Sequence, residues 1–137
     1  MKQFEPNEYP TIGVEEEYHL FDPATGELAS CLEDVRAKLD WPVSERVCPE
    51  LHYCTIECRT TVHRSVTQMA LQIAENRRAI AAAAQQCGMA VAAAGCSPTS
   101  DWRKQDIIDD EHYNWLLRNH GIIANRMLGL GLHVHVG

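Results

Sequence analysis

The stretch from Thr11 to Phe21, TIGVEEEYHLF, constrains the fold more than any other part of the chain. As an extended strand it sends successive side chains to opposite faces of a sheet. One face can pack on a core and carries Ile12, Val14, Tyr18 and Leu20. The other face carries Glu15, Glu17 and His19. Two carboxylates side by side on a strand repel each other unless a cation lies between them, and their hard oxygens favour Mg²⁺, Mn²⁺ or Ca²⁺. A solvated acidic sheet face is the alternative interpretation.

The composition is that of one soluble globular domain. The chain has 137 residues, of which 45% are hydrophobic and 23% are charged, so it is long enough to bury a core. Its formal net charge is −7, with 19 acidic and 12 basic residues. Because no stretch is densely basic, binding to the phosphate backbone of nucleic acids is not expected.

No targeting or membrane-spanning segment is expected. Residues 1–10 have no apolar run of the kind found in secretory signals. Residues 79–100 are uncharged but rich in alanine, and they are too weakly apolar to span a bilayer. The six cysteines show no CxxC spacing, which favours reduced thiols. We therefore expect a cytoplasmic protein that does not bind membranes.

Apolar periodicity predicts the remaining elements. Further strands are expected at residues 51–61, 89–94 and 132–136, and further helices at 33–39, 109–119 and 122–128. A long helix should begin after an N-cap at Ser65 and end before a C′ glycine, Gly88, with the stem of Arg77 along its apolar stripe. This order predicts a single α+β domain over residues 1–137, with helices packed on one face of a β-sheet.

Two histidines lie on the strand expected at residues 132–136. His133 and His135 point to the same face, where they could act as two nitrogen ligands, or as one ligand and one phosphate contact. Flanking glycines, Gly131 and Gly137, allow a close approach by another backbone or a ligand. The alternative is a hydrogen-bonded histidine pair without a metal.

Two further carboxylates lie near the second expected strand. Glu57 falls on its polar face, as Glu15 and Glu17 do on theirs. Glu50 has the opposite parity, so it joins the same site only if it lies before the strand or if a bulge intervenes. Otherwise it is a loop carboxylate.

A zinc site formed by Cys54, Cys58 and His52 is a rival interpretation. The two thiols share a strand face with Ile56, however. We therefore favour reduced cysteines buried in the core.

Five features occur in one order: Gly13-Val-Glu-Glu-Glu17, the pair Glu50 and Glu57 followed by Arg59-Thr60, an alanine-rich helix, Gly95-x-x-Pro98, and Gly131-Leu-His-Val-His-Val-Gly137. Together they resemble the carboxylate–amine ligase family related to bacterial and plant glutamate–cysteine ligases, within the glutamine synthetase-like fold. The resemblance extends over essentially the whole chain.

The resemblance implies an ATP-dependent ligase. By similarity, Glu15, Glu17, Glu57 and His133 would hold Mg²⁺ or Mn²⁺, with Glu50 as a further ligand, and His135 would contact the nucleotide phosphates. The substrates would be a small carboxylate and an amine, such as glutamate and cysteine. An acyl phosphate would form and the amine would then displace phosphate.

Two departures from the family pattern qualify this expectation. The family usually has Gly-Thr-His-Pro where this chain has Gly95-Cys-Ser-Pro98, and its members are much longer than 137 residues. We therefore expect an incomplete catalytic domain, the N-terminal part of a ligase, that is inactive alone and whose open sheet edges favour a homo-oligomer. The alternatives are a catalytically silent metal- or nucleotide-binding remnant acting with a partner, and a zinc-dependent hydrolase using His133, His135 and a carboxylate.

Overall fold

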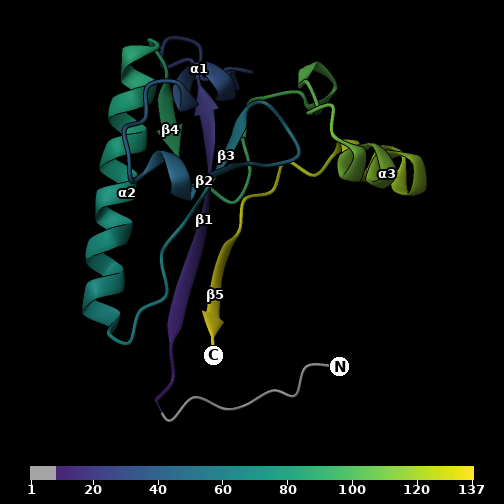
Figure 1. Ribbon diagram of the computed structural model, residues 1–137. Coiled ribbons are helices and arrows are strands. Elements are labelled where there is room, and N and C mark those ends of the chain that lie inside the picture. Colours follow the sequence, from purple (N-terminus) through teal and green to yellow (C-terminus); the bar gives the residue numbers. More distant parts are fainter. Residues whose placement is uncertain (1–8) are drawn as a thin grey trace.

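The computed structural model describes residues 9–137, which form one antiparallel sheet with helices around it (Figure 1). Its strands are β1 (Ile12–Phe21), β2 (Val47–Pro49), β3 (Thr55–Arg59), β4 (Ala90–Ala92) and β5 (Leu132–Val136). Its α-helices are α1 (Leu32–Arg36), α2 (Val66–Gln86), α3 (Glu111–His120) and α4 (Ile122–Asn125). Two short 3-10 helices are η1 (Ser44–Arg46) and η2 (Trp102–Lys104). The α+β fold expected from the sequence is confirmed.

Strand β1 is the centre of the sheet. It pairs with β3 along one edge, and along its other edge it pairs with β5 near its start and with β4 near its end. Strand β2 extends the sheet beyond β3, which gives the order β2-β3-β1-β4 with β5 beside β1. Strands distant in sequence therefore meet on both sides of β1.

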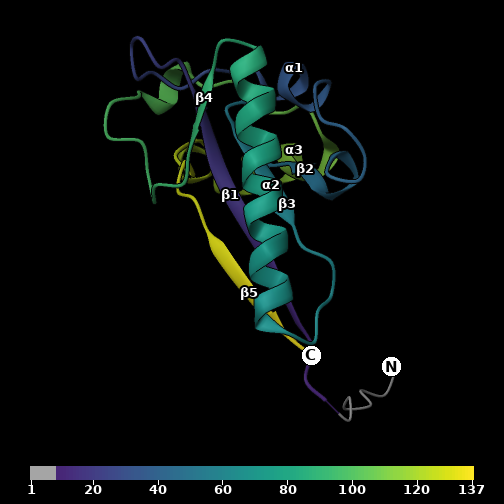
Figure 2. The same ribbon diagram turned by 90° about the vertical axis from the view of Figure 1, so that its left-hand side faces the viewer.

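Helix α2 covers the apolar face of the sheet (Figure 2). The N-cap Ser65 accepts a hydrogen bond from the backbone N–H of Gln68, and Gly88 adopts a positive φ of 73° just beyond the helix, as the sequence predicts. The buried core combines residues of the sheet, α1 and α2: Tyr18, Leu20, Leu32, Val35, Val43, Val47, Ile56, Cys58, Ile80, Ala83 and Ala84.

A charged pair lies on this apolar face. Glu16 is 5% exposed, and its carboxylate accepts hydrogen bonds from the guanidinium of Arg77 on α2 and from the Tyr18 hydroxyl. This pairing of the Arg77 head group was not predicted from the sequence. The pair connects α2 to the middle of β1.

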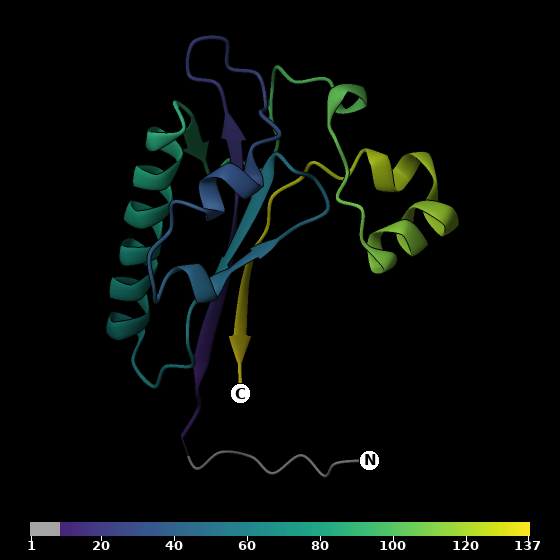
Figure 3. The same ribbon diagram turned by 45° about the horizontal axis from the view of Figure 1, so that its top comes forward.

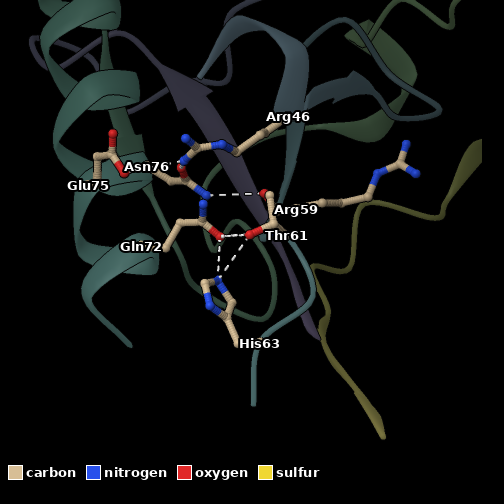
Figure 4. A network of polar contacts seen from close by, with 7 residues as sticks. All are labelled: Arg46, Arg59, Thr61, His63, Gln72, Glu75 and Asn76. Atoms are coloured by element: carbon tan, nitrogen blue, oxygen red, sulfur yellow. Dashed lines mark hydrogen bonds and ion pairs between the residues drawn. The ribbon is translucent and has the colours of Figure 1, made fainter. Parts of the chain in front are cut away.

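A second polar network docks α2 onto β3 and the segment that follows it (Figure 4). The buried Asn76 donates from Nδ2 to the carbonyl oxygen of Arg59 at 3.2 Å, and its Oδ1 accepts from Arg46 Nη1 at 2.7 Å. Nearer the start of α2, Gln72 Oε1 accepts from the Thr61 N–H at 2.7 Å and lies 2.8 Å from His63 Nε2. These contacts fix the strand that carries Glu57.

Helices α3 and α4 lie on the other side of the sheet from α2 (Figure 3). Gly121, with a φ of 52°, separates them, as the sequence predicts. Helices α1 and α2 thus cover the core face as expected, while α3 and α4 stand beside the polar face. The sequence predicted helices on one face of the sheet, whereas the structure has helices on both sides (Figure 3).

Several predicted boundaries were wrong. The second strand begins at Thr55 rather than residue 51, because Leu51 and Tyr53 bond to residues 106–108 instead of continuing the sheet. The first short helix ends at Arg36, the fourth strand covers only Ala90–Ala92, and α4 ends at Asn125. Strand β2 was not predicted, because a segment of three residues that ends in a proline is too short to show an alternation of apolar and polar side chains.

Candidate functional site

The polar face of the sheet brings together the acidic residues predicted from separate segments. Glu17 on β1 lies directly opposite Glu57 on β3, and Glu15 lies opposite His133 on β5. Directly opposed residues in an antiparallel pair project to the same face. Glu15, Glu17, Glu57 and His133 therefore share one surface, as the strand parities require.

Both histidines of β5 contact Glu15. Its Oε2 lies 3.1 Å from His135 Nε2 and 3.4 Å from His133 Nδ1. Burial raises the pKa of Glu15, but hydrogen bonds with His135 and His133 and the charge of Arg59 more than offset this, so the pKa lies below its ordinary value. The histidine pair thus helps to keep this carboxylate ionised.

Glu17 is held by the segment that leads into β5. The Gly131 N–H donates to Glu17 Oε2 at 2.8 Å, and the Glu17 N–H donates to the Gly131 carbonyl at 3.2 Å. A Cβ at residue 131 would lie 2.8 Å from His133 Nε2, so a larger residue here would require the His133 ring to shift. The predicted use of Gly131 for close approach is thus seen between two parts of the same chain.

Glu50 lies immediately after β2 and before β3, which satisfies the condition for joining the site. It lines a cavity of about 360 Å³ together with Glu17 and His133. The Tyr113 hydroxyl on α3 is 3.4 Å from Glu50 Oε2, so α3 reaches the carboxylates through this residue. Glu50 is therefore part of the acidic face.

Repulsion among these carboxylates changes their acidity. Burial raises the pKa of Glu57, and the charges of Glu15, Glu50 and Glu17 raise it further against the opposing effect of Arg59. Burial and the charge of Glu17 likewise raise the pKa of Glu50. A divalent cation among these groups would relieve that repulsion.

The donor set has the chemistry that Mg²⁺ or Mn²⁺ requires, with carboxylate oxygens and one imidazole on a single face. Within residues 9–137, however, no three His, Cys, Asp or Glu side chains converge closely enough to hold a metal ion. Internal partners explain this arrangement, since Glu15 faces two histidines, Glu17 binds Gly131 and Glu57 pairs with Arg59 at 3.1 Å. A metal ion could bind here only if its bonds to these carboxylates replaced some of these internal contacts.

Two buried histidines, His19 and His52, border the acidic face. His19 and His52 are 2% and 1% exposed, and neither Nε2 has a hydrogen-bond partner in the described part of the chain. Burial lowers the pKa of both imidazoles, although hydrogen bonds to the backbone of Leu128 and Asn125 act in the opposite direction. Both rings are therefore neutral near pH 7 and hold the segment between α4 and β5.

We expect these histidines to make the protein sensitive to mild acid. Their folded pKa values lie below the ordinary 6.5, so stability is complete above that pH and decreases below it, where the unfolded chain binds protons first. The Tm should decrease as the pH is lowered from about 7.5 to about 5. His52→Leu should flatten this dependence in thermal melts, and an unchanged slope would contradict the assignment.

The structure does not support the predicted alternative of a zinc site at Cys54, Cys58 and His52. The two cysteines are 0% and 2% exposed and belong to the core face with Ile56. His52 instead lines the cavity beside Glu50. The thiols and the imidazole therefore do not form a cluster.

The fold has a counterpart among solved structures. The structure resembles the crystal structure of glutamate–cysteine ligase from Francisella tularensis in complex with AMP, with a TM-score of 0.71 and 11% sequence identity. The match covers 94% of this chain and 27% of that chain. At this identity the likeness concerns the fold alone.

Sequence comparison gives the family. The profile of glutamate-cysteine ligase family 2 (GCS2) matches residues 11–137, and the chain belongs to this family. It is 39% identical over 127 residues to a protein of Herpetosiphon aurantiacus named "Putative glutamate--cysteine ligase 2", and 38% identical over 127 residues to a protein of the same name from Paracoccus denitrificans. Each alignment covers 93% of this chain but 33% and 34% of those relatives, so the chain spans about a third of their length.

No helix within residues 9–137 is long and apolar enough to cross a membrane.

Three contacts on this face were missed by reasoning from sequence. The ion pair between Arg59 and Glu57 was not predicted. Tyr113 lies 63 residues from Glu50, and no local pattern connects the two. His19 was placed on the correct face, but its burial depends on the distant segment around Leu128.

Proposed function

We propose that this chain is the N-terminal part of an ATP-dependent carboxylate–amine ligase that joins a small acid to an amine. The observation that carries the proposal is the convergence of Glu15, Glu17 and Glu57 on one sheet face, with Glu50 beside them. Membership of glutamate-cysteine ligase family 2 supports the ligase over the zinc-dependent hydrolase.

In this proposal Glu15, Glu17, Glu50, Glu57 and His133 hold Mg²⁺ or Mn²⁺, and His135 contacts the nucleotide phosphates. The bound cations would screen the charge of the triphosphate while a substrate carboxylate attacks the γ-phosphorus. The chain's own part is to fix the positions of the acidic groups through the paired strands and to keep Glu15 ionised through its two histidines.

The proposed substrates are a carboxylate and an amine of the glutamate and cysteine type, since the relatives carry the name glutamate–cysteine ligase. The amine would displace phosphate from an acyl phosphate and form the amide. No residue of this chain is assigned to recognition of either side chain.

We further propose that ligation requires polypeptide beyond these 137 residues. The chain spans about a third of its relatives, and β5 carries three exposed apolar side chains, Leu132, Val134 and Val136. In a glutamate, cysteine and ATP assay this chain alone should form no amide. Measurable product would contradict the proposed dependence on further polypeptide.

Calorimetry tests the nucleotide and metal site. Wild-type protein should bind ATP only in the presence of Mg²⁺ or Mn²⁺, and Glu57→Gln should weaken this binding at least about tenfold because it removes a charged ligand. Glu33→Gln is the matched control, since Glu33 pairs with Arg36 on α1 and is 63% exposed. Nucleotide binding that ignores both the metal and Glu57 would contradict the proposed site.

A further inference from the structure

Arg59 is a charged residue of the acidic face to which the proposed ligand set assigns no role. It lies opposite Glu15 in the β1–β3 register and two residues after Glu57, so its side chain shares their face. Its side chain is 49% exposed, whereas that of Glu57 is 15% exposed. A half-buried carboxylate is thus paired with a more exposed guanidinium.

Two contacts position the Arg59 side chain next to Glu57. Its Nε lies 3.1 Å from Glu57 Oε1, and its Nη2 contacts the sulfur of Cys48, which lies opposite Glu57 on β2. A guanidinium has five N–H donors, and these two contacts use only two of its three nitrogens. Within residues 9–137 the Nη1 of Arg59 makes no hydrogen bond or ion pair, so its donors can bind an anion.

Arg59 also lines a hollow of about 320 Å³, together with Glu15 and His135. The other lining residues belong to the start of β1, the end of β5 and the segment after β3, which meet at one end of the sheet. His135 is the residue proposed to contact the nucleotide phosphates. A planar guanidinium matches the geometry of phosphate oxygens better than an ammonium does.

We infer that Arg59 is an exchangeable counter-ion, which neutralises Glu57 in the absence of a divalent cation and contacts the nucleotide phosphates when a cation occupies Glu57. This inference rests on the proposed function. A positive charge at 3.1 Å from Glu57 competes with a divalent cation for the same oxygens. After displacement from Glu57, Arg59 would still line the hollow that it shares with His135, where the phosphates would lie in this proposal.

The exchange predicts opposite effects of one substitution. In Arg59→Met, Mn²⁺ without nucleotide should bind about twofold to fivefold more tightly, because its competitor is gone. ATP in the presence of Mn²⁺ should bind about tenfold more weakly, because a charge-assisted phosphate contact is lost. Arg59→Lys should retain the Mn²⁺ affinity of the wild type and lose part of the ATP affinity.

Calorimetric titrations with MnCl₂ and with ATP at saturating Mn²⁺ measure both effects. Arg36→Met is the control, since Arg36 also pairs with a glutamate at 3.1 Å but lies on α1, and it should change neither affinity. Thermal melts confirm that each variant is folded. Opposite shifts in the two affinities cannot come from a general loss of structure.

The other outcomes overturn the inference in distinguishable ways. Unchanged affinities in Arg59→Met would exclude a role for Arg59 and leave the proposed function intact. Weaker binding of both Mn²⁺ and ATP would show that Arg59 only positions Glu57. If the folded wild type bound neither Mn²⁺ nor ATP, the proposed function and the exchange would both be wrong.

Discussion

Replacing Arg77 by methionine should lower the free energy of unfolding by about 3 kcal/mol, because it leaves the Glu16 carboxylate buried without its cation. Glu16 is 5% exposed, and only the Tyr18 hydroxyl would still donate to it. Methionine preserves an unbranched apolar side chain at this position. Urea denaturation monitored by circular dichroism measures the loss.

Glu16→Gln is the matched comparison. It should cost only about 1 kcal/mol, because the neutral amide still accepts a hydrogen bond from Tyr18 and because the Arg77 side chain, which is 55% exposed, can turn to water. The double variant should resemble Glu16→Gln rather than the sum of the two changes. Equal losses in the two single variants would contradict this account of the pair.

The same pair should give a pH-dependent stability. Burial raises the pKa of Glu16, but hydrogen bonds from Arg77 and Tyr18 outweigh this and place it below the ordinary 4.5. The pair therefore contributes fully above that pH, and its contribution is lost as the carboxylate is protonated in both states. The difference between wild type and Arg77→Met should shrink from about pH 6 to about pH 3.

Asn76→Leu should lower the free energy of unfolding by about 2 to 4 kcal/mol. Leucine has a similar volume, so the loss comes from two broken contacts, to the Arg59 carbonyl at 3.2 Å and to Arg46 at 2.7 Å. Arg46 would keep only its longer contact with Glu75, at 3.4 Å. Chemical denaturation provides the measurement.

Asn119→Leu controls for the substitution itself. Asn119 is exposed on α3 and donates to the Trp115 carbonyl at 2.7 Å, so its loss should change stability by no more than about 0.5 kcal/mol. If Asn76→Leu had the same small effect, the network shown in Figure 4 would not be what docks α2 onto β3.

Much of the sheet could be predicted from the sequence because β5 alternates strictly and β1 does so except at Glu16. The two-residue period separates the face of Glu15 and Glu17 from that of Tyr18 and Leu20, and it applies equally to His133. Ser65 and Gly88 marked the limits of α2 because their preferences come from local backbone geometry. These features depend on near neighbours.

The features that escaped prediction depend on distant partners. Glu16 interrupts the apolar face of β1, and only Arg77, 61 residues later, explains its burial. The two-residue period also shows on which face of the sheet a side chain lies, but not which residue of the adjacent strand lies opposite it. Nothing in the sequence therefore places Glu57 opposite Glu17. The metal ligands remain a prediction, because the side chains are engaged by partners such as Arg59.

The pairing of β1 with β5 also bears on how the protein is made. Ile12 is in register with Val136, so two strands from opposite ends of these 137 residues must find each other. A ribosome releases the acidic strand long before the one that bears the histidines, and pairing over such a separation is slow. During synthesis, the part of the β1 edge that pairs with β5, residues 12–16, therefore stays open to other chains until residues 132–136 emerge.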